Sequence, residues 1–342
     1  ALGYFVDIYD LLLFSIVRIP SLQSMGAAPE ALLDEGEFLL QVQMTGLLVG
    51  GVIWGIMGDK RGRLSVLFGS ILMYSLANIA NGFATNVDQY AILRFVAGIG
   101  LAGELGAGIT LVSEVLPTRL RGYGTALVAT VGLFGAVLAN FVAKHFDWQT
   151  TYFIGGGLGL ALLIARASVF ESGLFVKVKE SAVERGNFFM LFTNSARLKR
   201  FIGCILIGLP IWYVIGILIT FSPEFARELG VDGDIIAGDA VMYSYLALAV
   251  GDFASGFISQ LVKSRKKIVL IFIFLTLGAI IFYLFLPIKT VVFFYIACGI
   301  LGFSIGYWAL FVTIAAEQFG TNLRSTVATT VPNFIRGTVV PI

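Results

Sequence analysis

The stretch GIMGDKRGRL, residues 55–64, sets one acid and three bases within five residues, between two long apolar runs. A membrane-spanning helix needs about 20 mostly apolar residues. The runs on either side, residues 38–57 and 64–85, are that long. The charged stretch therefore predicts a short turn at a membrane surface, between two spanning helices.

The composition of the whole chain agrees with a membrane protein. Its 342 residues are 58% hydrophobic and 13% charged, with a mean hydropathy of +0.92, whereas soluble domains carry about a quarter charged residues. The net charge of +2 gives no sign of a nucleic-acid partner. Two cysteines inside apolar runs indicate no disulfide framework, and a single histidine excludes a histidine-rich metal site. We expect no metal, no cofactor and no catalytic cluster, hence no enzyme.

Apolar runs of spanning length recur along the chain, whereas the alternating ten-residue segments of a β-barrel are absent. Ten runs are complete: residues 1–20, 38–57, 64–85, 88–116, 122–145, 148–170, 201–222, 236–261, 267–287 and 290–315. An eleventh begins near Ser325 and is cut by the chain end. The pattern predicts an all-α integral membrane protein. We expect it to be part of a longer protein without a cleavable signal peptide, because Asp7 and Asp10 interrupt the first apolar run.

The distribution of lysine and arginine predicts the orientation, because cytoplasmic loops are rich in these residues. With the first helix running outward, the inner loops hold 17 of the 23 basic residues. The outer stretches 29–38 and 223–234 are acidic instead. The sequence therefore predicts a multi-pass protein of the plasma (inner) membrane with a cytoplasmic N-terminus.

A sequence repeat divides the chain into two halves. SEVLPTRLRGYGTA (113–126) returns as AEQFGTNLRSTVAT (316–329), an offset of 203, and residues 55–63 have a weaker echo at 256–267. Parallel repeats of this kind form two bundles around a central site. We predict an N-terminal six-helix bundle (1–170), a cytoplasmic linker (171–200) and an incomplete C-terminal bundle (201–342), related by pseudo-two-fold symmetry.

The charged turn and two further segments resemble the major facilitator superfamily. The turn is similar to that family's signature between helices two and three, one residue shorter. RFVAGIGLAGELGAGITLVSEVLPTRLRG (94–122) and DWQTTYFIGG (147–156) resemble the metabolite and sugar:proton symporter branches. The resemblance covers nearly the whole chain. It implies a twelve-helix fold, of which about eleven helices are present here, and secondary active transport by alternating access.

The resemblance also implies a cytoplasmic gate. In the family this turn holds the two bundles together, so Asp59 would accept hydrogen bonds from the start of the eleventh helix, whose dipole favours an acid. Arg63 would pair with Glu114, with Arg121 nearby. Glu317 and Arg324 are the counterparts in the second half, where Gln260 replaces the acid. Anchoring by positive charge alone is the alternative.

Seven charged residues are expected deep in the bilayer rather than at its surfaces, although one charge at that depth costs roughly 2.5–3.5 kcal/mol on insertion scales. Carboxylates held between burial and a nearby base can bind and release protons. The proton-coupling candidates, led by Asp10 and Glu104, are Asp7, Asp10, Glu104 and Asp252. The substrate-binding candidates, with Arg94 and Arg336 expected to clamp a carboxylate, are Arg18, Arg94, Arg336, Tyr213, Tyr307 and Trp308. Internal ion pairing is the alternative for each charge.

The sequence thus favours proton-coupled uptake of a small, polar, anionic metabolite by a monomer in the lipid bilayer. An efflux antiporter is the nearest alternative, since RFVAGIG (94–100) also resembles drug exporters. The absence of a proline from TVGLFGAVLANF (130–141) favours uptake. A sensor that binds without transport is a further alternative, and sodium could replace the proton as coupling ion.

Overall fold

The computed structural model describes residues 2–115, 121–166, 186–285, 287, 289–320 and 323–338. Nearly all of these residues are helical, and one isolated bridge joins Asp232 to Thr290. The helices of the first part are α1 (Leu2–Ser24), η1 (Pro29–Ala31), α2 (Leu32–Arg61), α3 (Arg63–Asn81), α4 (Val87–Leu101), α5 (Glu104–Val115), α6 (Arg121–Leu133), α7 (Gly135–His145) and α8 (Trp148–Ala165). The later helices are η2 (Phe188–Leu191), α10 (Ser195–Tyr213), η3 (Val214–Ile219), α11 (Ser222–Glu228), α12 (Ala237–Leu261), α13 (Arg265–Phe285), α14 (Val291–Ser304), α15 (Trp308–Glu317) and α16 (Arg324–Thr338).

Among the described residues, nine helical segments are long and apolar enough to cross a membrane. Helix α1 is long enough but carries Asp7, Asp10 and Arg18. Large apolar side chains such as Phe274 and Phe285 are exposed on the outer surface, where lipid solvates them at no cost. The prediction of a multi-pass, all-α membrane protein is confirmed.

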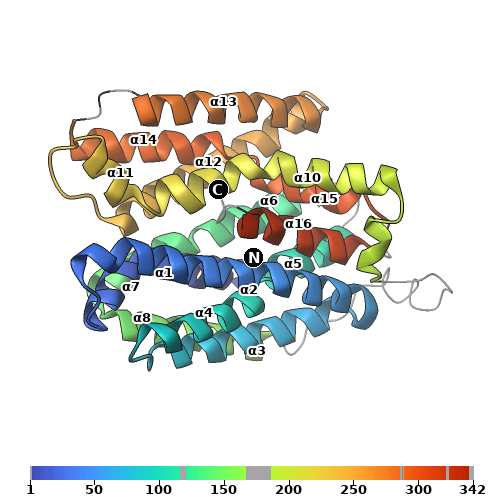
Figure 1. Ribbon diagram of the computed structural model, residues 1–342. Coiled ribbons are helices and arrows are strands. Elements are labelled where there is room, and N and C mark those ends of the chain that lie inside the picture. The colour runs from blue at the N-terminus through green and yellow to red at the C-terminus, as the bar shows by residue number, and fades with distance from the viewer. Residues whose placement is uncertain are drawn as a thin grey trace.

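The helices form two halves that lie side by side (Figure 1). We call helices α1 to α8 the N-half and helices α10 to α16 the C-half. Helix α16 lies at the boundary, against α2 and α5 of the N-half and α10 and α15 of the C-half. Residues 167–185 lie outside the described part, and α10 begins at Ser195, so the linker boundaries at 171 and 200 stay a prediction.

Glycines bring helices into close contact at equivalent places in the two halves. A Cβ atom on Gly50 of α2 would lie 2.4 Å from the Ile99 carbonyl oxygen of α4. In the C-half, a Cβ atom on Gly302 of α14 would lie 2.0 Å from the Ser244 carbonyl oxygen of α12. Only glycine permits such an approach, which is how membrane helices gain packing energy.

Four predicted spans are interrupted in the structure rather than continuous. Predicted helix 88–116 divides into α4 and α5, 122–145 into α6 and α7, 201–222 into α10 and the π-helical η3, and 290–315 into α14 and α15. Backbone groups released at such breaks must find partners inside the protein. The Asn333 side chain donates to the Ala102 carbonyl oxygen (2.8 Å), and Thr276 donates to that of Ser304 (2.9 Å).

Candidate functional site

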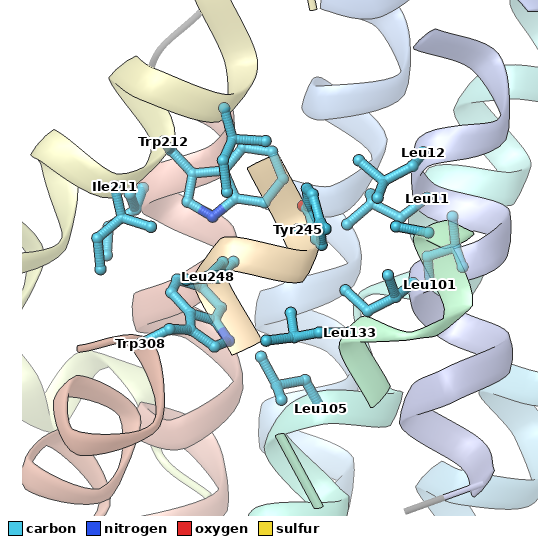
Figure 2. Packing of buried hydrophobic residues seen from close by; sticks show 14 of the residues in the cluster. Leu11, Leu12, Leu101, Leu105, Leu133, Ile211, Trp212, Tyr245, Leu248 and Trp308 are labelled. Carbon is cyan, nitrogen blue, oxygen red and sulfur yellow. The ribbon is translucent and has the colours of Figure 1, made fainter. Parts of the chain in front are cut away.

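A small cavity lies between the two halves. Around it, Leu11, Leu12 and Leu133 of the N-half pack with Trp212, Tyr245 and Trp308 of the C-half (Figure 2). The cavity measures about 10 Å³, space for about one water molecule. Its walls are Tyr4, Ile8, Leu133, Ile211, Trp212, Ile215, Tyr245, Leu248, Trp308 and Arg336. A metabolite is larger than this cavity, so these walls must move apart to hold one.

Arg336 of α16 is the charged residue of this cavity wall, and 1% of it is exposed. Its guanidinium carbon lies 5.0 Å from the ring centre of Trp212 and 5.6 Å from that of Trp308. Nη1 donates to the Asn333 side chain at 3.3 Å. Nε and Nη2 have no hydrogen-bond partner among the described residues. The site thus presents a positive charge with unused donors between two flat aromatic surfaces.

Tyrosines complete the polar part of the cavity wall. The Trp308 indole donates to the Tyr4 hydroxyl at 2.9 Å, a hydrogen bond between the halves. Tyr245 is 2% exposed and faces the cavity from α12. Predicted residues Arg336 and Trp308 therefore belong to one site, together with Tyr4, Trp212 and Tyr245, which are not among the predicted substrate-binding residues.

The predicted clamp of Arg94 and Arg336 is not what the structure shows. Arg94 lies inside the N-half, where it donates to Asn81 (3.2 Å) and Asn78 (2.8 Å) of α3. Its guanidinium carbon also lies 4.8 Å from the ring centre of Tyr152. Arg94 and the two asparagines form a polar cluster within one half, apart from the cavity wall. Asp10 of α1 is fully buried, and neither of its carboxylate oxygens has a hydrogen-bond partner among the described residues.

Glu104 and Asp252 each have a local partner. Arg166, at the end of α8, donates to both Glu104 carboxylate oxygens, at 2.9 and 2.6 Å. Asp252 accepts the backbone N–H of Ala309 at 3.1 Å and so satisfies the start of α15. For these two acids the ion-pair or structural interpretation fits the geometry.

Two predicted substrate-site aromatics also lie elsewhere. Tyr307 donates to the Ile207 carbonyl oxygen at 2.9 Å, inside the C-half. Tyr213 lines an apolar groove of about 370 Å³ between α10 and α13, on the outside of the bundle. Its neighbour Trp212 takes the place in the cavity wall, because successive residues of a helix point about 100° apart.

Arg18, another predicted substrate-site residue, closes one end of the interface instead. It forms an ion pair with Glu224 of α11 in the C-half, and 1% of its side chain is exposed. Beside it, Asn140 and Lys144 of α7 both contact Asp239 of α12. We call this the Glu224 end; ion pairs between the halves hold it closed.

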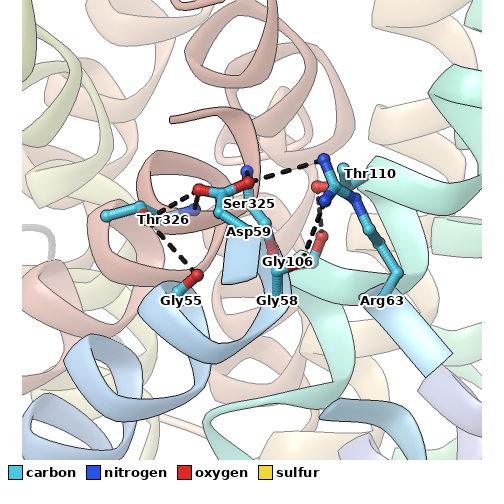
Figure 3. A network of polar contacts seen from close by, with 8 residues as sticks. All are labelled: Gly55, Gly58, Asp59, Arg63, Gly106, Thr110, Ser325 and Thr326. Atoms are coloured by element: carbon cyan, nitrogen blue, oxygen red, sulfur yellow. Dashed lines mark hydrogen bonds and ion pairs between the residues drawn. The ribbon is translucent and has the colours of Figure 1, made fainter. Parts of the chain in front are cut away.

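The opposite end, which we call the Asp59 end, is closed by the charged turn of α2 (Figure 3). Asp59 accepts the backbone N–H groups of Ser325 (3.1 Å) and Thr326 (2.8 Å) and the Thr326 hydroxyl (2.7 Å). These donors are at the first turn of α16, where the helix dipole favours a carboxylate. This is the contact expected of Asp59, and its role as a gate stays a prediction.

Of the other predicted gate residues, Arg63 lies beside Asp59. Arg63 is 1% exposed, lies 3.4 Å from Asp59 and donates to the Gly58 carbonyl oxygen at 2.8 Å. The side chains of Glu114 and Arg121 lie outside the described part. Glu317 pairs with Arg265 of α13. Arg324 is the first residue of α16.

The fold and the closed interface define a class of protein. The family model of the Major Facilitator Superfamily matches residues 2–335. The chain belongs to this superfamily and is a membrane transporter, not an enzyme.

Several curated proteins similar to this chain bear the names of metabolite transporters, and a solved sugar symporter has a similar fold. A probable 4-methylmuconolactone transporter of Cupriavidus pinatubonensis is 26% identical over 95% of this chain and 76% of its own length. The niacin transporter NiaP of Acinetobacter baylyi is 30% identical over 50% of this chain, and the match spans 39% of that protein. The crystal structure of a D-xylose-proton symporter has a TM-score of 0.71, at 16% identity, over 99% of this chain and 87% of that one.

Proposed function

We propose that this protein takes up a small aromatic or heteroaromatic carboxylate together with protons. The observation that carries the proposal is Arg336, buried between Trp212 and Trp308 with two nitrogens that lack partners among the described residues. A guanidinium binds a carboxylate through two parallel hydrogen bonds. The indole rings would contact the flat face of an aromatic substrate.

The relatives support this substrate class. Niacin is a heteroaromatic carboxylic acid, and a muconolactone is a small ring-bearing acid, so both offer the anion and the flat ring that the cavity wall is suited to bind. A sugar offers neither. The apolar residues Ile8, Leu133 and Leu248 would contact the ring edge and exclude water from the ion pair.

Transport would proceed by alternating opening of the two ends. We assign the structure to a compact intermediate between an open Asp59 end and an open Glu224 end, because its described residues make contacts between the halves at both ends and leave room for about one water in the cavity. We place the Asp59 end in the cytoplasm, because most lysines and arginines of the loops gather there. The protein would act as a monomer in the plasma membrane.

Uptake into liposomes tests the proposal. Vesicles with an alkaline interior should accumulate labelled nicotinate or benzoate, whereas D-xylose should not accumulate. Arg336→Gln should reduce initial uptake at least tenfold, since it removes the charge that binds the carboxylate. Arg200→Gln is the matched control, because Arg200 is exposed on α10, away from the cavity.

The outcomes separate the alternatives. Accumulation only when the proton gradient is reversed would identify an antiporter. Accumulation that follows a sodium gradient and ignores pH would identify sodium as the coupling ion. Binding of a carboxylate without any flux would identify a sensor, and transport of D-xylose in preference to every carboxylate would contradict the substrate class.

A further inference from the structure

Arg18 is the charged residue of α1 that reaches across to the C-half. It forms an ion pair with Glu224, and its guanidinium carbon lies 4.5 Å from the ring centre of Phe221. The two acids of α1, Asp7 and Asp10, are fully buried, but their carboxylate oxygens have no hydrogen-bond partners among the described residues. Within α1, the described contact of a charged side chain with the other half is therefore made by Arg18.

The ion pair uses only part of the hydrogen-bonding capacity of its two side chains. Nη2 of Arg18 donates to Oε1 of Glu224, whereas Nε and Nη1 have no partner in the described part of the chain. Oε2 of Glu224 has none there either. A guanidinium can bind a carboxylate through two parallel hydrogen bonds. A carboxylate that is free to orient itself can therefore bind Arg18 more completely than Glu224 does, because Glu224 is attached to α11.

The two partners of the ion pair differ in their exposure to solvent. Only 1% of the Arg18 side chain is exposed, against 25% of the Glu224 side chain. Gly36 of α2 leaves room for the arginine, since a Cβ atom there would lie 2.7 Å from the Arg18 Cδ atom. Removal of the acid alone would leave a buried charge without compensation, which is strongly unfavourable. An anion from solution that replaces Glu224 would keep the charge of Arg18 compensated.

A stripe of residues on α1 connects Arg18 with the central cavity. Its members are three or four residues apart and so share one face of the helix; they are Tyr4, Ile8, Leu11, Ser15 and Arg18. Tyr4 and Ile8 line the cavity wall, and the Ser15 hydroxyl lies 3.5 Å from that of Thr220 at the end of η3. At 1.5 Å per residue, Arg18 lies about 15 Å further along the helix axis than Ile8. Separation of the halves along this stripe would open a path from Arg18 to the cavity.

We propose that Arg18 is a second carboxylate-binding site, at which the substrate anion replaces the Glu224 carboxylate when the Glu224 end opens. This inference rests on the proposed function, which supplies the class of ligand, a small aromatic or heteroaromatic carboxylate. The substrate would bind Arg18 first and then pass along the stripe to Arg336. In the closed form Glu224 occupies the site, so an anion that binds only the open form shifts the equilibrium towards opening. Carboxylates should therefore open the Glu224 end through Arg18.

The test separates the two arginines by measuring opening in a chain that carries Arg336→Gln. Spin labels at two exposed positions, His145→Cys in the N-half and Asp234→Cys in the C-half, report the fraction of molecules with an open Glu224 end. Titration with benzoate should increase this fraction, whereas benzamide, which has the same ring but no charge, should not. Adding Arg18→Gln should raise the benzoate concentration that gives half of the effect at least tenfold.

Glu224→Gln in the same background tests the exchange without altering Arg18. The amide removes the competing carboxylate, so benzoate should reach half of its effect at a concentration at least threefold lower. If benzoate acted elsewhere, Glu224→Gln and Arg18→Gln would both weaken the closed end and change the response in the same direction. Glu228→Gln, an exposed acid on the same helix, is the control and should leave the response unchanged. Should Arg18→Gln fail to fold, Arg18→Lys keeps the charge without the two parallel hydrogen bonds and should raise the half-effect concentration at least threefold.

The outcomes distinguish this inference from the proposed function. No response of the Arg336→Gln chain to benzoate would overturn the inference, as would an equal response after Arg18→Gln. If the wild type accumulates neither nicotinate nor benzoate but benzoate still opens the Glu224 end through Arg18, the proposed function fails and the second site stands. Uptake of nicotinate that Arg336→Gln impairs, without any opening that depends on Arg18, contradicts the second site alone.

Discussion

At the scale of single residues, Asp59 makes several described polar contacts between the halves with one side chain. It accepts three hydrogen bonds from the first turn of α16 and lies 3.4 Å from Arg63. Hydrogen bonds to a charged acceptor contribute roughly 1.5–3 kcal/mol each. A change of this one residue should therefore alter the balance between closed and open states.

Asp59→Asn keeps the shape but removes the charge and part of the acceptor capacity. We expect this change to shift the free-energy difference between the closed and open states of the Asp59 end by about 1–3 kcal/mol towards the open state. Spin labels can be placed at Lys60→Cys and Gln318→Cys, two exposed positions near this end. The fraction of molecules with a long distance between the two labels should increase. Asp88→Asn is the control. Unchanged distance distributions would contradict the gating role of Asp59.

The contact of Asp59 with the start of the eleventh helix was implied by the resemblance of the charged turn to the family, and the structure has this contact. The sequence could not tell which buried charges meet, because the partners lie on distant helices. Glu104, for example, pairs with Arg166 at the end of α8. The place of Arg166 within the apolar run 148–170 was the available signal.

At the scale of elements, hydropathy predicted where helices lie but not where they break. The breaks after α4 and α14 depend on residues far away in sequence, such as Asn333 and Thr276, which satisfy the released carbonyl groups. A hydropathy window sees only apolar character and cannot detect those partners. The same limit explains why the sequence predicted Tyr213 as a substrate-site residue, whereas Trp212 lines the cavity. In a helix that is apolar all round, the sequence does not show which face points inward.

The close crossing of α2 and α4 gives a test at this scale. Gly50→Ala would place a Cβ atom 2.4 Å from the Ile99 carbonyl oxygen, and overpacking of this kind costs about 1–3 kcal/mol. We expect a lower midpoint of thermal unfolding in detergent. The control is Gly157→Ala on α8, where the added Cβ meets nothing within 4 Å. Equal midpoints for the two variants would show that the crossing is not tightly packed.

At the scale of the whole molecule, contacts at the two ends of the interface should favour opposite open states. Closing contacts exist at the Asp59 end and at the Glu224 end, and both are made in this structure. Alternating access requires that each end open while the other stays closed. The contacts at the two ends should therefore bias the same equilibrium in opposite directions.

A double variant tests this opposition. Glu224→Gln should favour opening of the Glu224 end, seen with spin labels at His145→Cys and Asp234→Cys, because it breaks the ion pair with buried Arg18. Combined with Asp59→Asn, it should return the relative populations of the two open states towards the wild type. Glu228→Gln, on the same helix but exposed, is the control. Independent, uncompensated shifts at the two ends would contradict a shared equilibrium.

The size of the central cavity matters for the cell as well as for the substrate. Protons cross membranes along continuous files of water, and the chamber between the described residues of the two halves holds about one molecule. A chamber of that size is too small for such a file. If uptake is coupled to protons as proposed, a narrow chamber would let a cell keep many copies in its membrane with little loss of the gradient.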